Sequence, residues 1–302
     1  MVPAAAGADR GGALVSLEVL QPKPKLSGRE LVRIVLSMTV ACLAGAAVLG
    51  AVYLGTDRYR RAAAEATERD AIRDMLGLDA GARLVEVRQF LEPRARRVVY
   101  RAAVYGDAAG QAREVTFALD GAAVGERSIP ASAPVPRELV GLGRMFVATR
   151  APGGDVAGFV AEGVTRGYKA PIRFFVAMKP DFEIADMRVV EIQDDPGLGA
   201  EVAQPWFREQ YVGRTAQEVA KLSVTRDPMP EDWKAALVAF ARRAPDGPER
   251  HRDLLRRERT KPIYAVTGAT ISSRAVTEGV RNTVDHFRRR WWLLAPHLEG
   301  AL

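Results

Sequence analysis

Cysteine and histidine are scarce in this sequence, with one cysteine, Cys42, and three histidines among 302 residues. A single cysteine excludes a disulfide within the chain, a Cys-x-x-Cys-His haem site, and an iron–sulfur cluster ligated by this chain alone. The histidines, His251, His286 and His297, lack the spacing that is typical of metal ligands. The sequence therefore predicts no metal site.

Aromatic residues are also few, at 7%, although the 48% hydrophobic and 27% charged residues are ordinary for a folded protein. The net charge of +7 indicates an anionic partner, but the basic residues are spread along the chain, so nucleic-acid binding is not predicted. Residues 242–261 contain eight Lys or Arg against four Asp or Glu. Two interpretations of this stretch stay open: a solvated loop with a short helix, and a docking surface for an acidic partner.

One long apolar run is present, and no second one follows it. Residues 34–54 read IVLSMTVACLAGAAVLGAVYL, 21 residues without a charge, which is enough for a helix to span a bilayer. A cleaved signal peptide is the alternative, but its apolar part is usually about 7–15 residues long and lies closer to the N-terminus. We therefore expect a single membrane-spanning helix. Basic residues flank it on both sides, so charge alone leaves its orientation open.

Composition and pattern divide the sequence into segments. We expect a disordered N-terminal tail at residues 1–30, a transmembrane helix at 31–56, a connecting helix at 57–82, a folded domain at 83–295 with a basic insertion near 242–261, and a C-terminal tail at 296–302.

Short runs rich in β-branched and aromatic residues predict strands in the folded domain. These runs are residues 84–91, 97–105, 114–119, 145–150, 156–162, 172–178 and 187–193. Turn sequences at 153–155 and 179–181 favour antiparallel pairing. With helical patterns at 233–243 and 273–293, the sequence predicts an α+β fold, a largely antiparallel sheet flanked by helices.

Near the C-terminus, a strand-like run at residues 263–266 leads into Thr-Gly-Ala-Thr at 267–270 and then into a helical pattern. Ser272 or Ser273 is expected to cap this helix. The free N–H groups and the dipole at a helix start favour an anion such as phosphate.

Within that turn, Gly268 and Ala269 leave room for a large group beside the backbone, and Thr270 offers a hydroxyl that can form a phosphoester. From these residues alone, an ordinary capped helix after a tight glycine turn is an open alternative.

The turn and its context resemble the FMN-binding domain shared by the RnfG subunits of Rnf-type electron-transport complexes and the NqrC subunits of the sodium-translocating NADH:quinone reductase. In that family the last Thr of the motif receives FMN from FAD through a dedicated flavin transferase. The resemblance implies covalent FMN on Thr270. It also implies a pocket for the phosphate made by the neighbouring residues, which are Thr267, Gly268, Ala269, Ile271 and Ser272.

A second resemblance lies some seventy residues upstream. Residues 167–172, Gly-Tyr-Lys-Ala-Pro-Ile, resemble the family's Gly-Tyr strand, and residues 194–199, Asp-Asp-Pro-Gly-Leu-Gly, resemble its acidic-Thr-Pro-Gly-Leu-Gly loop. This loop is most similar to that of the RnfG subunits. The resemblance implies that a loop lies against the flavin, formed by Asp194, Pro196, Gly197, Leu198 and Gly199, with Leu198 as its apolar contact.

The sequence departs from the family pattern at two positions. Tyr264 stands where the family usually has Asp, three residues before the first Thr of the motif, and this weakens the expected recognition by the transferase. Asp195 replaces the usual Thr of the loop and adds negative charge near a phosphate.

The resemblance implies a redox subunit, not a stand-alone catalyst, that relays electrons within a membrane-bound respiratory complex of a class that includes ion-translocating oxidoreductases. Its implied partners are the other membrane subunits and, during maturation, the flavin transferase. Its implied location is the inner membrane, with a single span and a periplasmic C-terminal domain. The alternative is a non-redox, membrane-anchored assembly or binding module of the same fold that has lost flavin.

Overall fold

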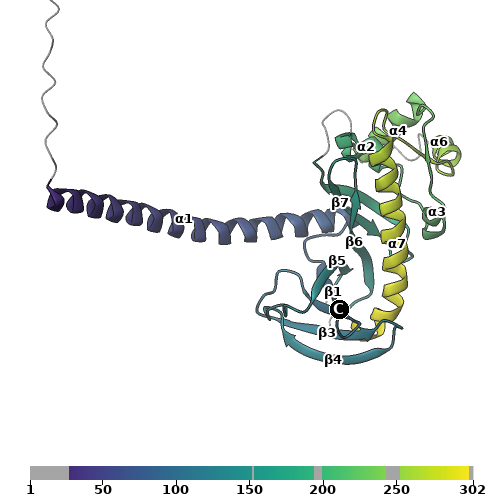
Figure 1. Ribbon diagram of the computed structural model, residues 1–302. Coiled ribbons are helices and arrows are strands. Elements are labelled where there is room, and N and C mark those ends of the chain that lie inside the picture. Colours follow the sequence, from purple (N-terminus) through teal and green to yellow (C-terminus); the bar gives the residue numbers. More distant parts are fainter. Residues whose placement is uncertain (1–26, 152, 194–198, 243–251, 299–301) are drawn as a thin grey trace, which may run out of the picture. The chain divides into compact units, whose positions relative to one another are not determined.

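The computed structural model describes residues 27–151, 153–193, 199–242, 252–298 and 302 (Figure 1). The chain divides into two compact units, Met1–Arg61 and Ala62–Leu302. The elements, in chain order, are α1 (Gly28–Leu76), β1 (Arg83–Glu92), β2 (Arg97–Val104), β3 (Gln111–Ala118), β4 (Ala123–Pro130), β5 (Val140–Thr149), β6 (Val156–Arg166), β7 (Pro171–Met178), β8 (Ile184–Glu191), η1 (Gly199–Ala203), α2 (Pro205–Arg208), α3 (Ala216–Ala220), β9 (Val224–Thr225), α4 (Glu231–Ala241), α6 (Arg252–Glu258), β10 (Ile263–Tyr264) and α7 (Thr270–Leu298).

The described part of the first unit is the apolar half of α1. Its large side chains are open to the surroundings; Leu36, Leu43 and Leu49, for example, are 62%, 64% and 72% exposed. With a mean hydropathy of 2.2 over its most apolar stretch, α1 is long and apolar enough to cross a membrane, and it is the one such helix in the described part of the chain. Exposed leucines along a whole helix are unfavourable in water and favourable in lipid.

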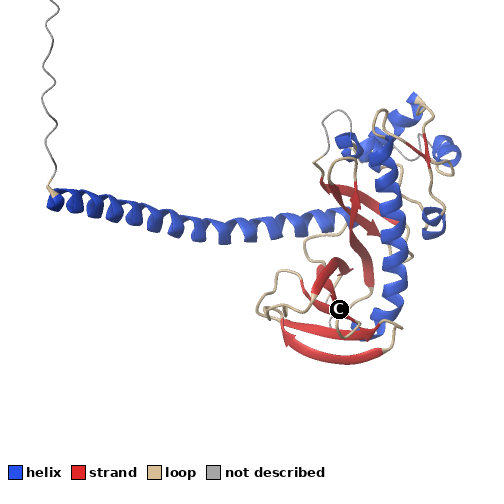
Figure 2. Ribbon diagram, viewed as in Figure 1, coloured by secondary structure: helices blue, strands red, loops and turns tan. Residues whose placement is uncertain are grey.

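The second unit is built on an eight-stranded sheet with the strand order β4-β3-β2-β1-β5-β6-β7-β8 (Figure 2). Each neighbouring pair is antiparallel. Helix α7, yellow in Figure 1, runs along one face of this sheet and contacts β6 and β7. The predicted α+β class with an antiparallel sheet is therefore confirmed.

The two faces of the sheet carry separate hydrophobic cores, because successive side chains of a strand point to opposite faces. In β6, Phe159 and Ala161 belong to one cluster and Val160 to the other. The first cluster includes the buried side of α7. The second includes Ile72 and Met75, from the part of α1 that belongs to the second unit.

Helix α7 lies close to the sheet because two glycines allow it. A Cβ on Gly279 of α7 would lie 2.9 Å from the Phe174 ring and 3.1 Å from Cβ of Thr165. A Cβ on Gly163 of β6 would lie 2.4 Å from the same ring. These contacts allow α7 and the strands to approach closely, and any larger residue at either position would push them apart.

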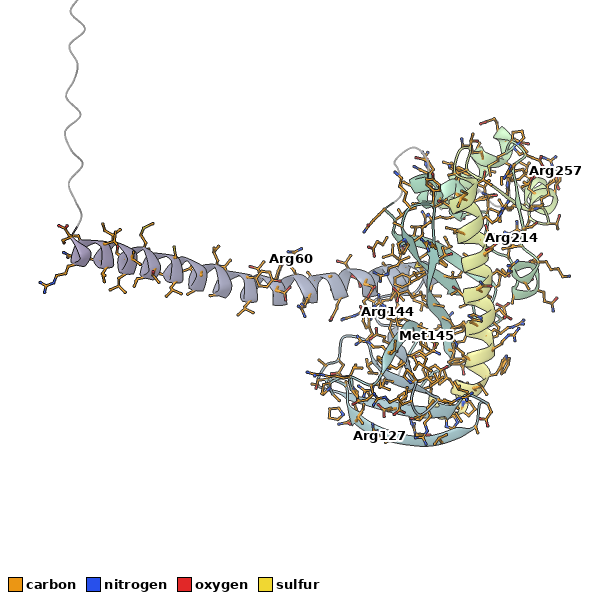
Figure 3. All side chains as sticks on the ribbon, viewed as in Figure 1. Arg60, Arg127, Arg144, Met145, Arg214 and Arg257 are labelled. Carbon is orange, nitrogen blue, oxygen red and sulfur yellow. The ribbon has the colours of Figure 1, made fainter. Side chains whose placement is uncertain are left out.

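The opposite face carries a charged cluster beside its hydrophobic core. Arg144 and Met145, both labelled in Figure 3, are neighbours in β5, and Met145 belongs to the α7 side. The Arg144 guanidinium binds both carboxylate oxygens of Glu68, at 2.6 and 2.9 Å, and Glu162 at 2.9 Å. The Tyr105 hydroxyl also donates to Glu68. Burial raises the pKa of Glu68, but the bonds from Arg144 and Tyr105 outweigh it and hold that pKa below its usual value.

The structure adds a strand that the sequence does not predict. β4 pairs with β3 at the edge of the sheet, and each of its residues is exposed or partly exposed. Its sequence, Ala-Val-Gly-Glu-Arg-Ser-Ile-Pro, lacks the apolar alternation by which strands are recognised. The first four residues of β5 are exposed as well, and the predicted strand accordingly began too late, at residue 145.

Candidate functional site

The Thr-Gly-Ala-Thr segment forms a tight turn between β10 and α7. The N–H of Ala269 donates to the carbonyl of Val266 at 3.0 Å, which closes the turn. Gly268 has φ +80°, a left-handed conformation that glycine adopts without strain. Helix α7 then begins at Thr270 itself. The strand, turn and helix predicted around these residues are therefore present.

The predicted N-cap is wrong. Ser272 and Ser273 lie inside the first turn of α7 and are buried, because the helix starts three residues before Ser273. The Ser273 hydroxyl instead accepts a hydrogen bond from the N–H of Val266, at 3.0 Å. This serine ties the beginning of the helix back to the strand that precedes the turn.

Exposure varies along the turn. Thr267 and Gly268 are exposed, Thr270 is half-buried, and Ala269 is buried at 6% exposure. Ile271 is 59% exposed, which is high for a large apolar side chain. Thr270 is therefore partly exposed on the first residue of the helix, at a defined backbone position.

The Gly-Tyr segment at residues 167–172 lies beside this turn. The Tyr168 N–H donates to the Ser272 hydroxyl at 3.3 Å, and the Thr165 hydroxyl donates to the carbonyl of Ala275 at 3.0 Å. The Tyr168 side chain is 66% exposed. Two segments that are about a hundred residues apart are thus brought to the same end of α7, and one of them carries the exposed Tyr168.

Most of the second predicted loop, namely Asp194, Asp195, Pro196, Gly197 and Leu198, lies outside the described residues. Gly199 is described; it is buried and begins η1. Helix η1 contacts both α7 and β8, and its Val202 shares a core cluster with Val276 of α7. The described end of this loop therefore meets the same helix as the Thr-Gly-Ala-Thr turn.

A glutamine that sequence reasoning missed holds the strand before the turn. The side-chain amide of Gln210 accepts from the N–H of Tyr264 at 2.8 Å and donates to its carbonyl at 3.2 Å. Gln210 is itself buried, at 4% exposure. Because Gln210 and Tyr264 are 54 positions apart in the chain, their contact leaves no local signal in the sequence.

Tyr264, the residue at the departure from the family pattern, is buried and points to a carboxylate. Its hydroxyl donates to Glu258 at 2.9 Å. The pKa of Tyr264 is raised, mainly because the side chain is buried and also because its hydroxyl donates to Glu258. Burial also raises the pKa of Glu258, but hydrogen bonds from Lys261, Arg257 and Tyr264 outweigh it and hold the pKa of Glu258 below its usual value.

These features suit a phosphate ester on Thr270. Thr270 is partly exposed, and it stands at a helix start, where backbone N–H groups and the dipole favour an anion. The exposed side chain of Ile271, the next residue, provides apolar surface for a flat ring, and the exposed Tyr168 lies in the segment that is hydrogen-bonded to Ser272. The residues present therefore fit a phosphate-linked aromatic cofactor.

Residues 167–285 match the protein family described as FMN-binding domain. Over 133 residues, the chain is 29% identical to the G subunit of the proton-translocating ferredoxin:NAD(+) oxidoreductase complex of Clostridium ljungdahlii, a stretch that covers 44% of this chain and 55% of that protein. Over 136 residues, it is 26% identical to the G subunit of the Na(+)-translocating ferredoxin:NAD(+) oxidoreductase complex of Acetobacterium woodii, covering 45% and 51%. The chain thus spans about half the length of these curated relatives.

Two solved structures are also similar. NqrC of Shewanella oneidensis is 14% identical, with a TM-score of 0.41, and the match covers 75% of this chain and 98% of that one. The C subunit of the Na(+)-translocating NADH-quinone reductase from Parabacteroides distasonis is 16% identical, with a TM-score of 0.34 and coverage of 56% and 72%.

Proposed function

We propose that this chain, whose residues 167–285 match the FMN-binding domain family, is a membrane-anchored flavoprotein that carries FMN on Thr270 and relays electrons within a membrane-bound complex. The observation that carries the proposal is the position of Thr270. It is a half-buried hydroxyl on the first residue of α7, directly after a glycine turn and inside the matched segment.

The attachment that we propose is a phosphoester made from FAD by a flavin transferase. The Thr270 oxygen forms a bond to the flavin-bearing phosphorus of FAD, and the bond between that phosphorus and the bridging oxygen of the diphosphate breaks. AMP leaves, and the proton of the hydroxyl is lost. No oxidant or reductant is needed, because the step is a phosphoryl-type transfer.

The residues around Thr270 have distinct roles in this proposal. Thr267, Gly268 and Ala269 hold the turn that presents the hydroxyl, while Ile271 and Ser272 continue the phosphate site into α7. Asp194, Pro196, Gly197, Leu198 and Gly199 form the second loop of the site, in which Leu198 gives the apolar contact. FMN supplies one- and two-electron transfer, and a covalent link prevents its loss from the protein.

The wider setting is also a proposal. The relatives are subunits of proton- and Na(+)-translocating ferredoxin:NAD(+) oxidoreductase complexes. We propose that this chain is a comparable subunit. Residues 31–56 would anchor it in the inner membrane, residues 57–82 would connect the anchor to the domain at 83–295, and that domain would lie in the periplasm. Its partners would be the other membrane subunits of the complex.

In-gel flavin fluorescence after coexpression with a flavin transferase tests the attachment. The wild type should fluoresce in a denaturing gel, and Thr270→Ala should not. Thr67→Ala is the control, since it removes an exposed threonine hydroxyl from α1, outside the attachment turn, and should keep the fluorescence. Equal signals from the wild type and Thr270→Ala would overturn the assignment. A wild type without colour would instead support the non-redox module.

A further inference from the structure

The strand that leads to the turn is fixed on its backbone. Parallel pairing of β10 with β9 places Tyr264 beside Thr225, and the N–H groups of Ile263 and Ala265 donate to the carbonyls of Ser223 and Thr225, at 2.9 and 3.0 Å. Gln210 brackets the Tyr264 peptide from another side. The backbone of Tyr264 is therefore held by β9 and by the side chain of Gln210.

The Tyr264 side chain makes a separate connection, to α6. The Glu258 carboxylate is 2% exposed and accepts hydrogen bonds on both oxygens. Lys261 Nζ and Arg257 Nε donate to Oε1, each at 2.9 Å, and the Tyr264 hydroxyl donates to Oε2 at 2.9 Å. A buried carboxylate with several donors is strongly held, and the removal of one donor leaves part of it unpaired.

Helices α4 and α6 share a small hydrophobic core with Tyr264. Tyr264 belongs to a cluster with Trp233, Ala236 and Leu237 of α4, and Leu254 and Leu255 of α6 pack against it. Arg214, labelled with Arg257 in Figure 3, donates to the carbonyls of Gln210 and Lys261 at 2.8 and 3.0 Å. Helix α6 and β10, the strand before the turn, are thus in contact through Tyr264.

From these contacts we propose that Tyr264 and Glu258, here called the Tyr264–Glu258 latch, are positioning residues that hold the Thr267–Thr270 turn for attachment of its flavin phosphate. The inference rests on the proposed function and deepens it. It gives α6, a helix within the basic stretch at residues 242–261, the role of supporting the turn that carries Thr270.

The path from the latch to Thr270 is short and hydrogen-bonded. Two residues after Tyr264, the N–H of Val266 is held by the Ser273 hydroxyl and its carbonyl by the N–H of Ala269. A shift of Tyr264 toward or away from α6 is therefore passed to the residue that precedes Thr270. Group transfer is sensitive to such shifts, since a misplacement of about 1 Å can lower a rate about 100-fold.

The test measures flavin attachment over time with full-length protein in detergent, purified flavin transferase and FAD. Tyr264→Phe keeps the ring in its apolar cluster and removes only the hydroxyl. We expect its attachment rate to fall about tenfold, the scale of a lost hydrogen bond to a charged group. The final extent of attachment and the KM for FAD should not change, because FAD binds the transferase and the chain remains folded. If the substitution unfolded part of the protein, the final extent of flavin attachment would fall instead of its rate.

Two further variants complete the design. Tyr105→Phe is the matched control, because Tyr105 also donates to a glutamate, Glu68, but on the other face of the sheet; its attachment rate should equal that of the wild type. Glu258→Gln keeps an acceptor for Tyr264 and should slow attachment less than Glu258→Ala.

Hydrogen exchange of the protein without flavin gives a second readout. The amides of Val266 and Ala269 should exchange faster in Tyr264→Phe than in the wild type. Equal attachment rates and equal exchange in these two proteins would overturn the latch while leaving the proposed function intact. A wild type that takes up no flavin would overturn both.

Discussion

At the scale of single residues, the site depends on hydroxyl groups whose roles differ although their residue types are similar. Thr270 is half-buried at the first position of α7, whereas Ser273 is fully buried and accepts a hydrogen bond from the Val266 N–H. The sequence predicts the turn and the importance of its hydroxyls. It assigns the cap incorrectly, because capping preferences favour serine and the structure begins the helix after Ala269, which has no side chain that could cap.

Ser273→Ala should loosen the attachment turn without removing Thr270. The substitution leaves the buried N–H of Val266 without its acceptor, at a cost of about 1–3 kcal/mol in the free energy of unfolding. Urea denaturation of the purified protein measures this cost. Ser128→Ala, which removes an exposed hydroxyl on β4, should change the stability little; equal effects of the two substitutions would contradict the role of Ser273.

At the scale of elements, the end of α1 behaves as part of the folded domain. Residues 62–76 share the second unit with the sheet, and Glu68 joins them to Arg144 of β5. The apolar span and the strands with alternating patterns are visible in the sequence because burial imposes the pattern. Edge strand β4 is not visible, since it buries almost nothing. Contacts such as those of Gln210 with Tyr264 join residues 54 positions apart and leave no local signal.

Glu68 should make the stability of the domain depend on pH. Its folded-state pKa is lowered, so its stabilising effect is complete above the usual carboxyl value of 4.5 and is lost as the pH falls through the lowered folded-state pKa. Glu68→Gln should lower the free energy of unfolding by about 1–3 kcal/mol near neutral pH. The difference from the wild type should shrink in acid, as measured by thermal melting across pH.

Glu126→Gln is the control for that series, because Glu126 lies on the exposed edge strand β4 and pairs there with Arg113 of β3. Exposed pairs add little to stability. A difference between the wild type and Glu68→Gln that stayed constant down to strong acid would contradict the assigned role of Glu68.

At the scale of the whole molecule, the proposed function places residues 31–56 of α1 in the membrane and the second unit in the periplasm. The sequence leaves the orientation open because basic residues flank the span on both sides. The single cysteine makes the orientation measurable, since Cys42 lies within the apolar run and the rest of the chain has no thiol.

A cysteine introduced on the exposed edge strand reports the side of the membrane. Ser128→Cys should react with a membrane-impermeant maleimide added to intact spheroplasts, while the wild type, with Cys42 in the bilayer, should not react. Labelling of Ser128→Cys only after lysis would place the domain in the cytoplasm and contradict the proposed orientation.

Peptide mass spectrometry of the protein, coexpressed with a flavin transferase, determines whether and where FMN is attached. We predict that the peptide containing Thr270 carries one FMN as a phosphoester and that fragmentation assigns the added mass to Thr270, not to Thr267. An unmodified peptide, or an adduct that fragmentation assigns to another residue, would contradict it.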